Sequence, residues 1–285
     1  MSFRHSETLR VRWSEVDAQG IVFNGHYLNY LDTASSGYWR MLGLPYPSAF
    51  ERLGADLVLR STELDFLAPA RFDEVLQGRL RFVEVGRTSL RFEAELLRGA
   101  QCLLKARLRY VMVGREGATA LLPVPVPEGL RAALQAFEAG EPMLAVQVGS
   151  WAELGADAQP IRQAVFVREQ GIPADLEWDQ ADPACTHAVA YNRLGQALGT
   201  GRLLEHVPGT AKIGRMAVLA AARGTGVGAQ VLEALMQAAR RQGYRQVLLH
   251  AQASAVGFYR RAGFAPRGLP FEEAGIEHQE MLKTI

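Results

Sequence analysis

A proline-rich segment near the middle of this chain limits how it can fold. Residues 121–127 read LLPVPVP, and three prolines within five residues exclude both a helix and a central strand there. An alanine-rich stretch, Glu128–Ala139, then predicts a short helix, and Gly140–Pro142 breaks the chain again. We therefore expect a first domain over residues 1–120, a linker with a short helix over 121–142, and a second domain over 143–285.

Composition excludes several classes of protein. The formal net charge is +1 with no run of Lys and Arg, which argues against a nucleic-acid partner. No apolar run approaches the ~18–20 residues of a membrane span, and the N-terminus lacks the apolar core of a signal peptide. Cys102 and Cys185 lie in no CxxC or Cys/His spacing, so we expect neither a zinc site nor a disulfide framework. These features favour a cytoplasmic protein without a metal or a membrane partner.

The first domain begins with a short strand at Arg10–Trp13 and a loop, followed by a helical pattern over His26–Leu42. A glycine at position 37 would weaken this helix, and we expect it to let a strand pack closely. Gly43 is placed to end the helix. Apolar residues recur at three- and four-residue spacing at Tyr27, Tyr30, Leu31, Ala34, Tyr38, Met41 and Leu42.

The period then changes to two, which is typical of half-buried antiparallel strands. The alternation shifts phase within Leu80–Val85, which predicts a bulge, and Gly86–Thr88 predicts a hairpin turn. The expected architecture is α+β: one long helix, then a meander of about four long strands that wraps around it. The alternating inward residues are Leu90, Phe92, Ala94 and Leu96, then Leu104, Ala106, Leu108, Tyr110 and Met112.

The second domain reads as a mixed α/β fold. Helices are predicted at Ile161–Gln170, Ala229–Arg241 and Ala255–Ala262. Strands are predicted at Ala188–Tyr191, Ala197–Leu204, Ala211–Val218 and Val247–Ala251.

Asp17 and Gly20 lie in the loop before the long helix of the first domain. The N-terminus of a helix offers unpaired N–H groups and a positive dipole end, which could hold the oxyanion formed when a thioester carbonyl is attacked. A nearby carboxylate could attack that carbonyl or activate a water. From the spacing alone, Asp17 could equally be an ordinary loop or capping residue.

This stretch resembles the 4-hydroxybenzoyl-CoA thioesterase family of hotdog folds, and the resemblance covers about residues 6–120. The family signature runs approximately D-x-D-x-x-G-x-V-x-(N/H)-x-x-Y, with a conservative Glu at the first acidic position here. The matching residues are Glu15, Asp17, Gly20, Val22, Asn24 and Tyr27.

The resemblance implies roles for four of these residues. Asp17 matches the catalytic carboxylate, Gly20 the tight loop that admits the substrate, and Asn24 a polar orienting group. Asn24 could instead be a helix N-cap, and Tyr27 could line the pocket or simply pack in the core. Family members bind their CoA thioester at a subunit interface, which implies a homo-oligomer, either a dimer or a tetramer.

In the second domain, a glycine-rich loop over Arg223–Gly228 joins a strand to a helix. Such glycines let the backbone approach a phosphate, which the N–H groups and the helix dipole then bind. The loop lacks the Gly-Lys-Ser/Thr ending of a P-loop, and by itself it could be only a flexible turn.

The loop resembles the (Q/R)-x-x-G-x-(G/A) pyrophosphate loop of the GNAT acetyltransferases, and Phe258–Phe264 resembles their F-Y-x-x-x-G-F motif. The resemblance covers about residues 143–285 and includes features of the ElaA-like branch. It implies that Tyr259 protonates the leaving thiolate. The residues implied to bind acetyl-CoA are Met216, Ala217, Val218, Arg223, Gly224, Thr225, Gly226, Val227 and Gly228.

The general base of the acetyltransferase stays open among Glu169, Glu177 and His187, each of which could instead be structural. The expected function is that of a bifunctional enzyme with acyl-CoA and acetyl-CoA as substrates, an amine as acetyl acceptor and no tightly bound cofactor. Two alternatives remain: a thioesterase with a C-terminal acetyl-CoA sensor, or an acetyltransferase with a structural, oligomerising hotdog domain.

Overall fold

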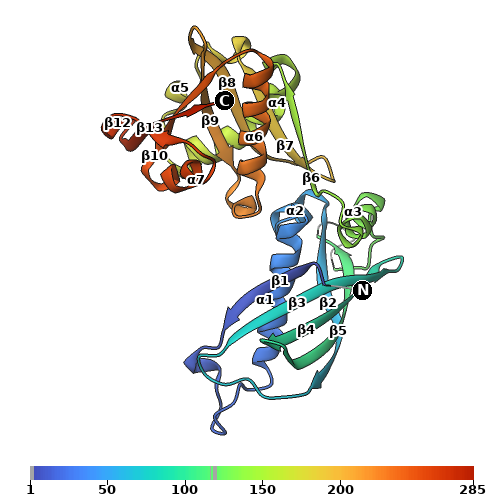
Figure 1. Cartoon of the computed structure of the whole chain (residues 1–285). Coiled ribbons are helices and arrows are strands. Elements are labelled where there is room, and N and C mark those ends of the chain that lie inside the picture. The colour runs from blue at the N-terminus through green and yellow to red at the C-terminus, as the bar shows by residue number, and fades with distance from the viewer. Residues whose placement is uncertain (1–2, 116, 118–120) are drawn as a thin grey trace. The chain divides into compact units, whose positions relative to one another are not determined.

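The computed structural model describes residues 3–115, 117 and 121–285. The chain divides into two compact units, Met1–Met143 and Leu144–Ile285 (Figure 1). The expected end of the first domain, residue 120, lies outside the described residues.

The N-terminal unit is a five-stranded antiparallel sheet that covers one long helix, α1 (His26–Met41) (Figure 1). This is the predicted hotdog arrangement, and the helix is confirmed. The strand order is β1-β3-β4-β5-β2. The strands are β1 (His5–Arg10), β2 (Ala55–Phe66), β3 (Val75–Val85), β4 (Ser89–Arg98) and β5 (Gln101–Gly114).

Two expectations about this sheet were wrong. The first strand is His5–Arg10, whereas Trp13–Glu15 forms a 3-10 turn. The more buried positions of β1 include His5 and Glu7, which are polar. The strand therefore lacks the alternation of apolar and polar residues that would have predicted it. Furthermore, only β3, β4 and β5 form a meander, because β2 pairs with β5 and lies at the edge of the sheet.

Close packing of β1 on α1 depends on Gly37, as predicted. A Cβ at this position would lie 2.2 Å from Glu7 Oε2 and 2.8 Å from His5 Cε1. The neighbouring residues of the helix stripe, Ala34 and Tyr38, are fully buried. The glycine therefore weakens the helix in isolation but allows the strand to reach it.

The predicted bulge and hairpin are also confirmed. The β3–β4 register shifts between Phe82 and Glu84, and Gly86–Thr88 joins the two strands. Helix α3 (Glu128–Ala139) matches its predicted bounds and packs on this unit. Glu138 Oε1 accepts hydrogen bonds from the Phe82 N–H and the Tyr38 hydroxyl, both at 2.8 Å. A short helix, α2 (Ser48–Arg52), follows α1.

The C-terminal unit is an eight-stranded mixed sheet in the order β11-β13-β10-β9-β8-β7-β6, with β12 paired to β13. Four predicted strands are present, whereas β6 and the C-terminal strands were not predicted. The strands are β6 (Leu144–Gly149), β7 (Thr186–Asn192), β8 (Ala197–Val207), β9 (Thr210–Val218), β10 (Gln246–Gln252), β11 (Ala265–Pro266), β12 (Phe271–Glu273) and β13 (Ile276–Thr284).

The helices of this unit are α4 (Trp151–Arg162), α5 (Ala174–Glu177), α6 (Val227–Arg241) and α7 (Val256–Arg261). The predicted helix at Ile161–Gln170 began too late, because α4 starts at Trp151 and continues as a π-helical turn over Gln163–Glu169. A capping box marks the true start: the Ser150 N–H donates to Glu153 Oε2 at 2.8 Å.

Among the described residues, no helix is long and apolar enough to cross a membrane.

Candidate active sites

Asp17 lies in a tight loop of the N-terminal unit. Its N–H donates to the Ile21 carbonyl at 2.9 Å, and its Oδ1 accepts the Gln19 N–H at 2.8 Å. Gly20 closes the loop with φ +75°, a conformation that side-chain-bearing residues rarely adopt. Asp17 is half-buried, and Oδ2 has no hydrogen-bond partner among the described residues. One carboxylate oxygen is thus held in place while the other is available to a ligand.

Glu15 holds the turn that precedes this loop. Its Oε2 accepts the Arg12 N–H at 2.7 Å and the Tyr30 hydroxyl at 2.6 Å. Burial, together with this contact to Glu15, raises the pKa of Tyr30 above its ordinary value. Glu15 therefore orders the loop on α1.

The unpaired backbone N–H groups expected at the N-terminus of α1 lie just before the helix and not in its first turn. The N–H groups of His26–Leu28 already donate to the carbonyls of Phe23–Gly25, at 2.9 to 3.3 Å. In the described structure, the N–H groups of Asn24 and Gly25 are left without an acceptor. Gly25 is the N-cap, so Asn24 does not cap the helix, and its side chain is exposed.

Tyr27 packs in the core of the single chain. It is 2% exposed, and its hydroxyl accepts the Ala70 N–H at 3.0 Å. Its ring meets Phe66 edge-on, with centroids 5.2 Å apart. The buried Tyr27 side chain would have to move, or its surroundings open, before it could contact a substrate.

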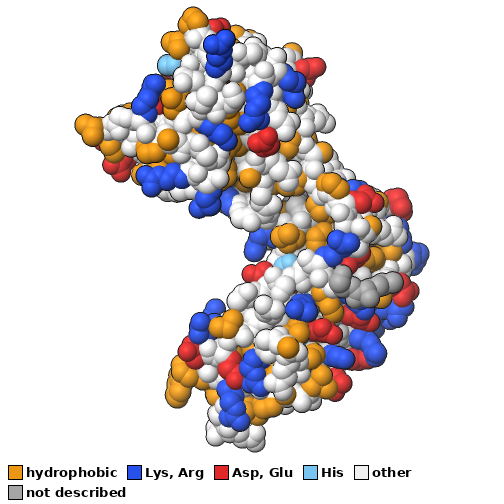
Figure 2. Space-filling view, viewed as in Figure 1, with side chains coloured by type: hydrophobic (Ala, Val, Ile, Leu, Met, Phe, Trp, Pro, Cys, Tyr) orange, Lys and Arg blue, Asp and Glu red, His pale blue; other side chains and the backbone are white. Residues whose placement is uncertain are grey.

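Aromatic side chains are exposed around the loop. Trp13, Phe23 and Phe72 are 78%, 56% and 51% exposed. Trp13 and Phe72 contact each other edge-on, with centroids 5.5 Å apart. Hydrophobic side chains lie on the surface at the end of the unit where this loop lies (Figure 2). A group of exposed aromatic side chains around a polar loop is typical of a surface that binds another molecule.

A cavity of about 580 Å³ opens in the C-terminal unit. It contains Tyr259 and one of the predicted acetyl-CoA-binding residues, Met216. The residues that line it include Phe166, Gln170, Met216, His250, Gln252 and Tyr259.

Two neighbouring parallel strands separate at this cavity. The pairing of β9 with β10 runs from Thr210↔Gln246 to Ile213↔Leu249. Beyond that pair, β9 continues to Val218 and is paired only with β8 in the described sheet. Arg215 takes a left-handed φ of +51° where the β8–β9 register shifts. The backbone edge of Met216–Val218 that faces β10 has no strand partner among the described residues, although the Val218 carbonyl accepts a hydrogen bond from Arg223 Nε.

The glycine loop lies directly before α6. Gly224 and Gly226 have φ values of +80° and +88°, and Gly226 is the N-cap of α6. The Thr225 hydroxyl donates to the Ala222 carbonyl at 2.7 Å, which closes the loop. The first helical bond to reach the loop is that of Gln230 N–H to Gly226 O, at 3.1 Å. The preceding N–H groups at this helix start could therefore bind an anion.

Arg223 anchors the same loop. It forms a bidentate ion pair with Glu169, with N···O distances of 2.6 and 2.7 Å, and its Nε donates to the Val218 carbonyl. This contact with Arg223 lowers the pKa of Glu169. A carboxylate held in this way is a poor candidate for the general base.

Tyr259 is positioned by α7 and is 7% exposed. Its ring contacts Phe258 and Phe264 with centroids 4.9 and 6.0 Å away. Burial raises the pKa of Tyr259 to about 12. The phenol therefore keeps its proton at neutral pH, as a proton donor must.

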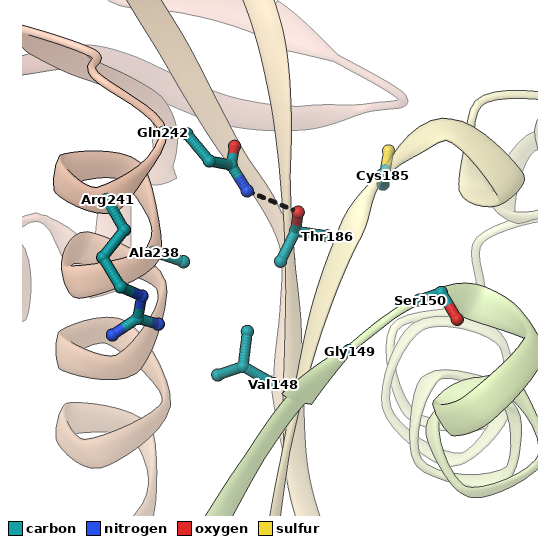
Figure 3. A pocket seen from close by; sticks show the side chains of 8 residues that line it. All are labelled: Val148, Gly149, Ser150, Cys185, Thr186, Ala238, Arg241 and Gln242. Atoms are coloured by element: carbon teal, nitrogen blue, oxygen red, sulfur yellow. Dashed lines mark hydrogen bonds between the residues drawn. The ribbon is translucent and has the colours of Figure 1, made fainter.

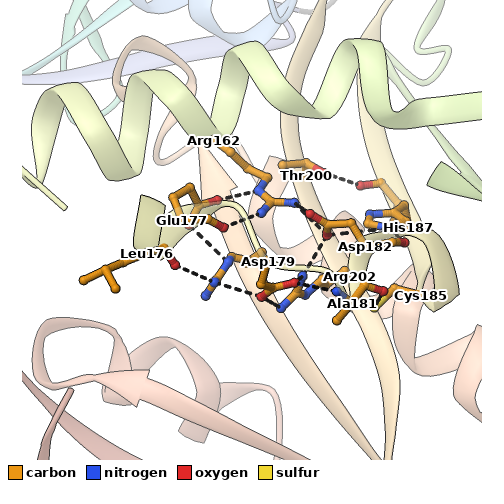
Figure 4. A network of polar contacts seen from close by, with 12 residues as sticks. Arg162, Leu176, Glu177, Asp179, Ala181, Asp182, Cys185, His187, Thr200 and Arg202 are labelled. Carbon is orange, nitrogen blue, oxygen red and sulfur yellow. Dashed lines mark hydrogen bonds and ion pairs between the residues drawn. The ribbon is translucent and has the colours of Figure 1, made fainter. Parts of the chain in front are cut away.

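A buried network of charges fixes one wall of the cavity (Figure 4). Arg162, which is 1% exposed, donates to both oxygens of Asp182 at 2.9 and 3.0 Å and pairs with Glu177. Arg202 donates to Asp182 Oδ1 at 2.7 Å.

Two of the proposed general bases belong to this network. Arg162 binds Glu177 Oε1, and Arg215 lies 3.1 Å from Glu177 Oε2. His187 is 1% exposed, and its Nε2 lies 2.9 Å from the Asp182 carbonyl. Burial lowers the pKa of His187 and raises that of Glu177. Their contacts indicate structural roles for both side chains.

A smaller cavity of about 330 Å³ shares no lining residue with the first (Figure 3). Gln242 donates to the Thr186 hydroxyl across it at 2.9 Å. Burial raises the pKa of the Cys185 thiol, which makes it a poor nucleophile. Nothing in this cavity provides an acid and a base together.

Among the described residues, no group of three or more His, Cys, Asp and Glu side chains could hold a metal ion.

The fold and the sites define the class of protein in two parts. A carboxylate loop before a long helix covered by an antiparallel sheet is typical of hotdog thioesterases. Parallel strands that separate beside a glycine loop and a buried tyrosine are typical of GNAT acyltransferases.

Comparison with known families agrees with this division. Residues 19–103 match the model of the thioesterase superfamily, and residues 164–285 match that of the acetyltransferase (GNAT) domain. The chain therefore belongs to both families, as a thioesterase-superfamily domain followed by a GNAT domain.

Individual relatives match one unit each. An uncharacterized N-acetyltransferase, YjcF, of Bacillus subtilis is 37% identical over 45% of this chain and 90% of its own length. A putative esterase of Aquifex aeolicus is 30% identical over 43% of this chain and 94% of its own. The crystal structure of an acyl-CoA N-acyltransferase from Pseudomonas aeruginosa is 34% identical, covers 49% of this chain and 99% of its own, and gives a TM-score of 0.45.

Proposed function

We propose that the chain is a bifunctional enzyme of CoA esters: its N-terminal unit hydrolyses acyl-CoA thioesters, and its C-terminal unit transfers an acetyl group from acetyl-CoA to an amine. The observation that carries this proposal is that each unit has a reactive side chain and unpaired backbone N–H groups of its own. Asp17 lies in the loop that leads into α1, where the N–H groups of Asn24 and Gly25 have no acceptor among the described residues, and Tyr259 lines the cavity where β9 leaves β10.

In the C-terminal unit, the pyrophosphate of acetyl-CoA would bind the N–H groups of Gly224–Gly228 at the start of α6. The pantetheine arm would then add to the open edge of Met216–Val218, in the manner of a short strand. This places the thioester next to Tyr259. After the amine attacks the carbonyl carbon and the C–S bond breaks, the phenol would give its proton to the thiolate.

In the N-terminal unit, the thioester oxygen would accept hydrogen bonds from the N–H groups of Asn24 and Gly25. These donors would stabilise the negative charge that develops on that oxygen during attack. Asp17 would either attack the carbonyl carbon or remove a proton from an attacking water. The Asn24 side chain would orient the substrate, and Gly20 would let it approach the loop.

A homo-oligomer would complete this site. β2 is a 12-residue strand at the edge of the sheet, and its Val58 and Leu59 are 45% and 40% exposed. A long apolar edge strand is a template for pairing with another strand. Pairing of β2 with its copy would extend the sheet, and the exposed aromatics near Asp17 would be covered by the partner.

The hydrolase is tested by thiol release from acyl-CoAs of graded chain length, without amine. Wild type should show a length preference, and Asp17→Asn should lose the activity. The matched control is Asp32→Asn, because Asp32 is an exposed residue on α1. Hydrolysis that persists in Asp17→Asn would refute the role of Asp17. Absence of hydrolysis in wild type would favour a structural hotdog unit.

The acetyltransferase is tested by amine-dependent thiol release from acetyl-CoA, using spermidine, tryptamine, glucosamine and an alanine-initiated peptide. Binding of acetyl-CoA is measured in parallel by calorimetry. Transfer to at least one amine is expected. Binding without transfer to any of them would favour a sensor domain.

A further inference from the structure

The three residues first considered as the general base are held in structural contacts, so another group must accept the proton of the amine. The cavity that contains Tyr259 offers such a group, because side chains of β9, β10 and β12 also line it. Lys212, His250 and Glu273 all line the cavity that contains Tyr259. Tyr259 and His250 therefore line one and the same cavity.

Glu273 fixes the imidazole of His250. The distance from His250 Nδ1 to Glu273 Oε2 is 3.0 Å, and the Phe271 ring packs edge-on against the imidazole with centroids 4.8 Å apart. His250 is largely buried, with 24% of its side chain exposed. Contact with His250 lowers the pKa of Glu273 against the effect of burial, so the carboxylate is ionised at neutral pH.

The same contact selects the tautomer of His250. Nδ1 also lies 3.3 Å from Lys212 Nζ, but an ammonium can only donate to a bare Nδ1, whereas a carboxylate can only accept from an Nδ1–H. The shorter, charge-assisted contact is the one with Glu273, which favours Nδ1–H. The lone pair of the neutral ring is then on Nε2, where it can act as a base.

Among the described residues, Nε2 has no partner within hydrogen-bond distance. Glu280 Oε2 lies 3.8 Å away, beyond hydrogen-bond distance, and Glu280 is itself paired with Arg267. His278, the other imidazole of the cavity, contacts the Ile276 carbonyl through Nδ1 at 2.8 Å. His250 is thus the imidazole that combines a fixed orientation by a carboxylate with an available nitrogen.

We propose that His250 is the general base of acetyl transfer and that Glu273 is its positioning residue. This inference rests on the proposed acetyltransferase function and adds the group that activates the acceptor. The acceptor is an amine that enters as its ammonium form.

His250 Nε2 takes one proton from the ammonium, and the nitrogen lone pair that is exposed attacks the carbonyl carbon. The C–S bond breaks, the thiolate takes the proton of Tyr259, and the nitrogen loses its second proton to restore that phenol. His250 then releases its proton to solvent, so the sum is ammonium plus acetyl-CoA to amide, free CoA and one proton.

The kinetic test compares His250→Gln and Glu273→Gln with wild type, using the amine that reacts best. His250→Gln should lower kcat/KM by roughly 100-fold and abolish the acidic limb of its pH profile, while the Kd of acetyl-CoA stays within about twofold. Glu273→Gln should lower kcat by a smaller factor. His206→Gln, at an exposed histidine of the same unit, is the control.

Other charged or titratable groups lie near His250 on β9, β12 and β13. Lys212, Glu273 and Glu280 have atoms within 4 Å of its ring nitrogens, and His278 lines the same cavity. A His250→Gln enzyme that keeps its acidic limb and its kcat/KM would overturn the proposal.

A second measurement does not depend on finding the amine. ¹⁵N chemical shifts of the His250 ring, assigned by comparison with His250→Gln, report its tautomer in the full chain. We expect Nδ1–H in wild type and a loss of this preference in Glu273→Gln. A dominant Nε2–H tautomer in wild type would overturn the proposal even if no amine reacts. If the Nδ1–H tautomer is observed but no amine is acetylated, the result would instead count against the acetyltransferase function alone.

Discussion

At the scale of single residues, the proposed mechanism assigns the two proton transfers to Tyr259, which is 7% exposed, and to His250, whose side chain is 24% exposed. Replacement of Tyr259 with Phe removes the proton donor but keeps the ring packing against Phe258 and Phe264. We expect kcat for acetyl transfer to fall by roughly 100-fold, with an unchanged Kd for acetyl-CoA. Because burial raises the pKa of Tyr259 to about 12, wild type should show no alkaline limb from this group below about pH 10.

Steady-state kinetics and calorimetry on the same preparation test this prediction. A Phe variant that keeps its kcat would show that the thiolate leaves without help from the phenol.

Asp179 gives a residue-scale prediction about pH. Its hydrogen bond with Arg202 lowers its pKa from 3.8 to about 2. A carboxyl whose pKa is lower in the folded state stabilises the fold above its unfolded pKa and loses that contribution as pH falls through the folded pKa. The contribution should therefore be complete above about pH 4 and decline toward pH 2.

Thermal unfolding of wild type and Asp179→Asn between pH 2 and pH 6 measures this contribution. The difference in Tm should be largest between pH 4 and pH 6 and shrink below pH 4, whereas the exposed-residue control Asp175→Asn should show no difference that depends on pH in this way. A difference that stays constant across this range would contradict the assignment.

The sequence predicted the chemistry of some residues and missed others. Asp17 and Tyr259 could be proposed because each lies in a short contiguous motif. His250 and Glu273 could not, because they are 23 residues apart and meet only where β10 and β12 face one cavity. Glu177 and His187 have side chains that could act as a base, so the sequence could not rule them out. Only their contacts in the fold indicate that their roles are structural.

At the scale of elements, the packing of β1 on α1 gives a stability prediction. Gly37→Ala should gain roughly 1 kcal/mol of helix propensity. Its new methyl group, however, would meet the buried His5 ring at 2.8 Å, and overpacking of this kind costs about 1–3 kcal/mol. We expect a net loss of stability in the N-terminal unit.

Denaturant unfolding of Gly37→Ala measures this loss of stability, and Ser36→Ala is the control. Gly99→Ala is not a suitable control, because Gly99 has a positive φ. A variant more stable than wild type would show that β1 yields to the added methyl group.

Elements with strong periodicity could be predicted, and those that depend on tertiary contacts could not. α1, α3, β4, β5 and α6 lie close to their expected bounds, since apolar residues recur at one period throughout each. β6 and β13 were missed because they alternate weakly, and the start of α4 was hidden by Gly155 and Pro160 within the helix. The position of β2 at the sheet edge depends on long-range pairing, which no local pattern specifies.

At the scale of the whole molecule, assembly should decide whether the first site works. The double variant Val58→Lys/Leu59→Lys places like charges on the edge of β2 and should disrupt its pairing with a second copy. Light scattering should show a smaller species, and thioester hydrolysis should fall while acetyl-CoA binding remains. Val83→Lys is the control, because Val83 is 50% exposed on β3, a strand with partners on both sides.

An unchanged mass with reduced hydrolysis would place the interface elsewhere. A monomeric wild type would show that β2 does not pair with a second copy in solution.

In the proposed function, one chain carries two separate CoA-ester sites. Thiol release from acyl-CoA without amine, and from acetyl-CoA with amine, is measured on Asp17→Asn and on Tyr259→Phe. We expect that Asp17→Asn loses only the first activity and that Tyr259→Phe is impaired only in the second. If either substitution abolished both activities, or if Asp17→Asn retained amine-independent hydrolysis, the claim of two separate sites would be contradicted.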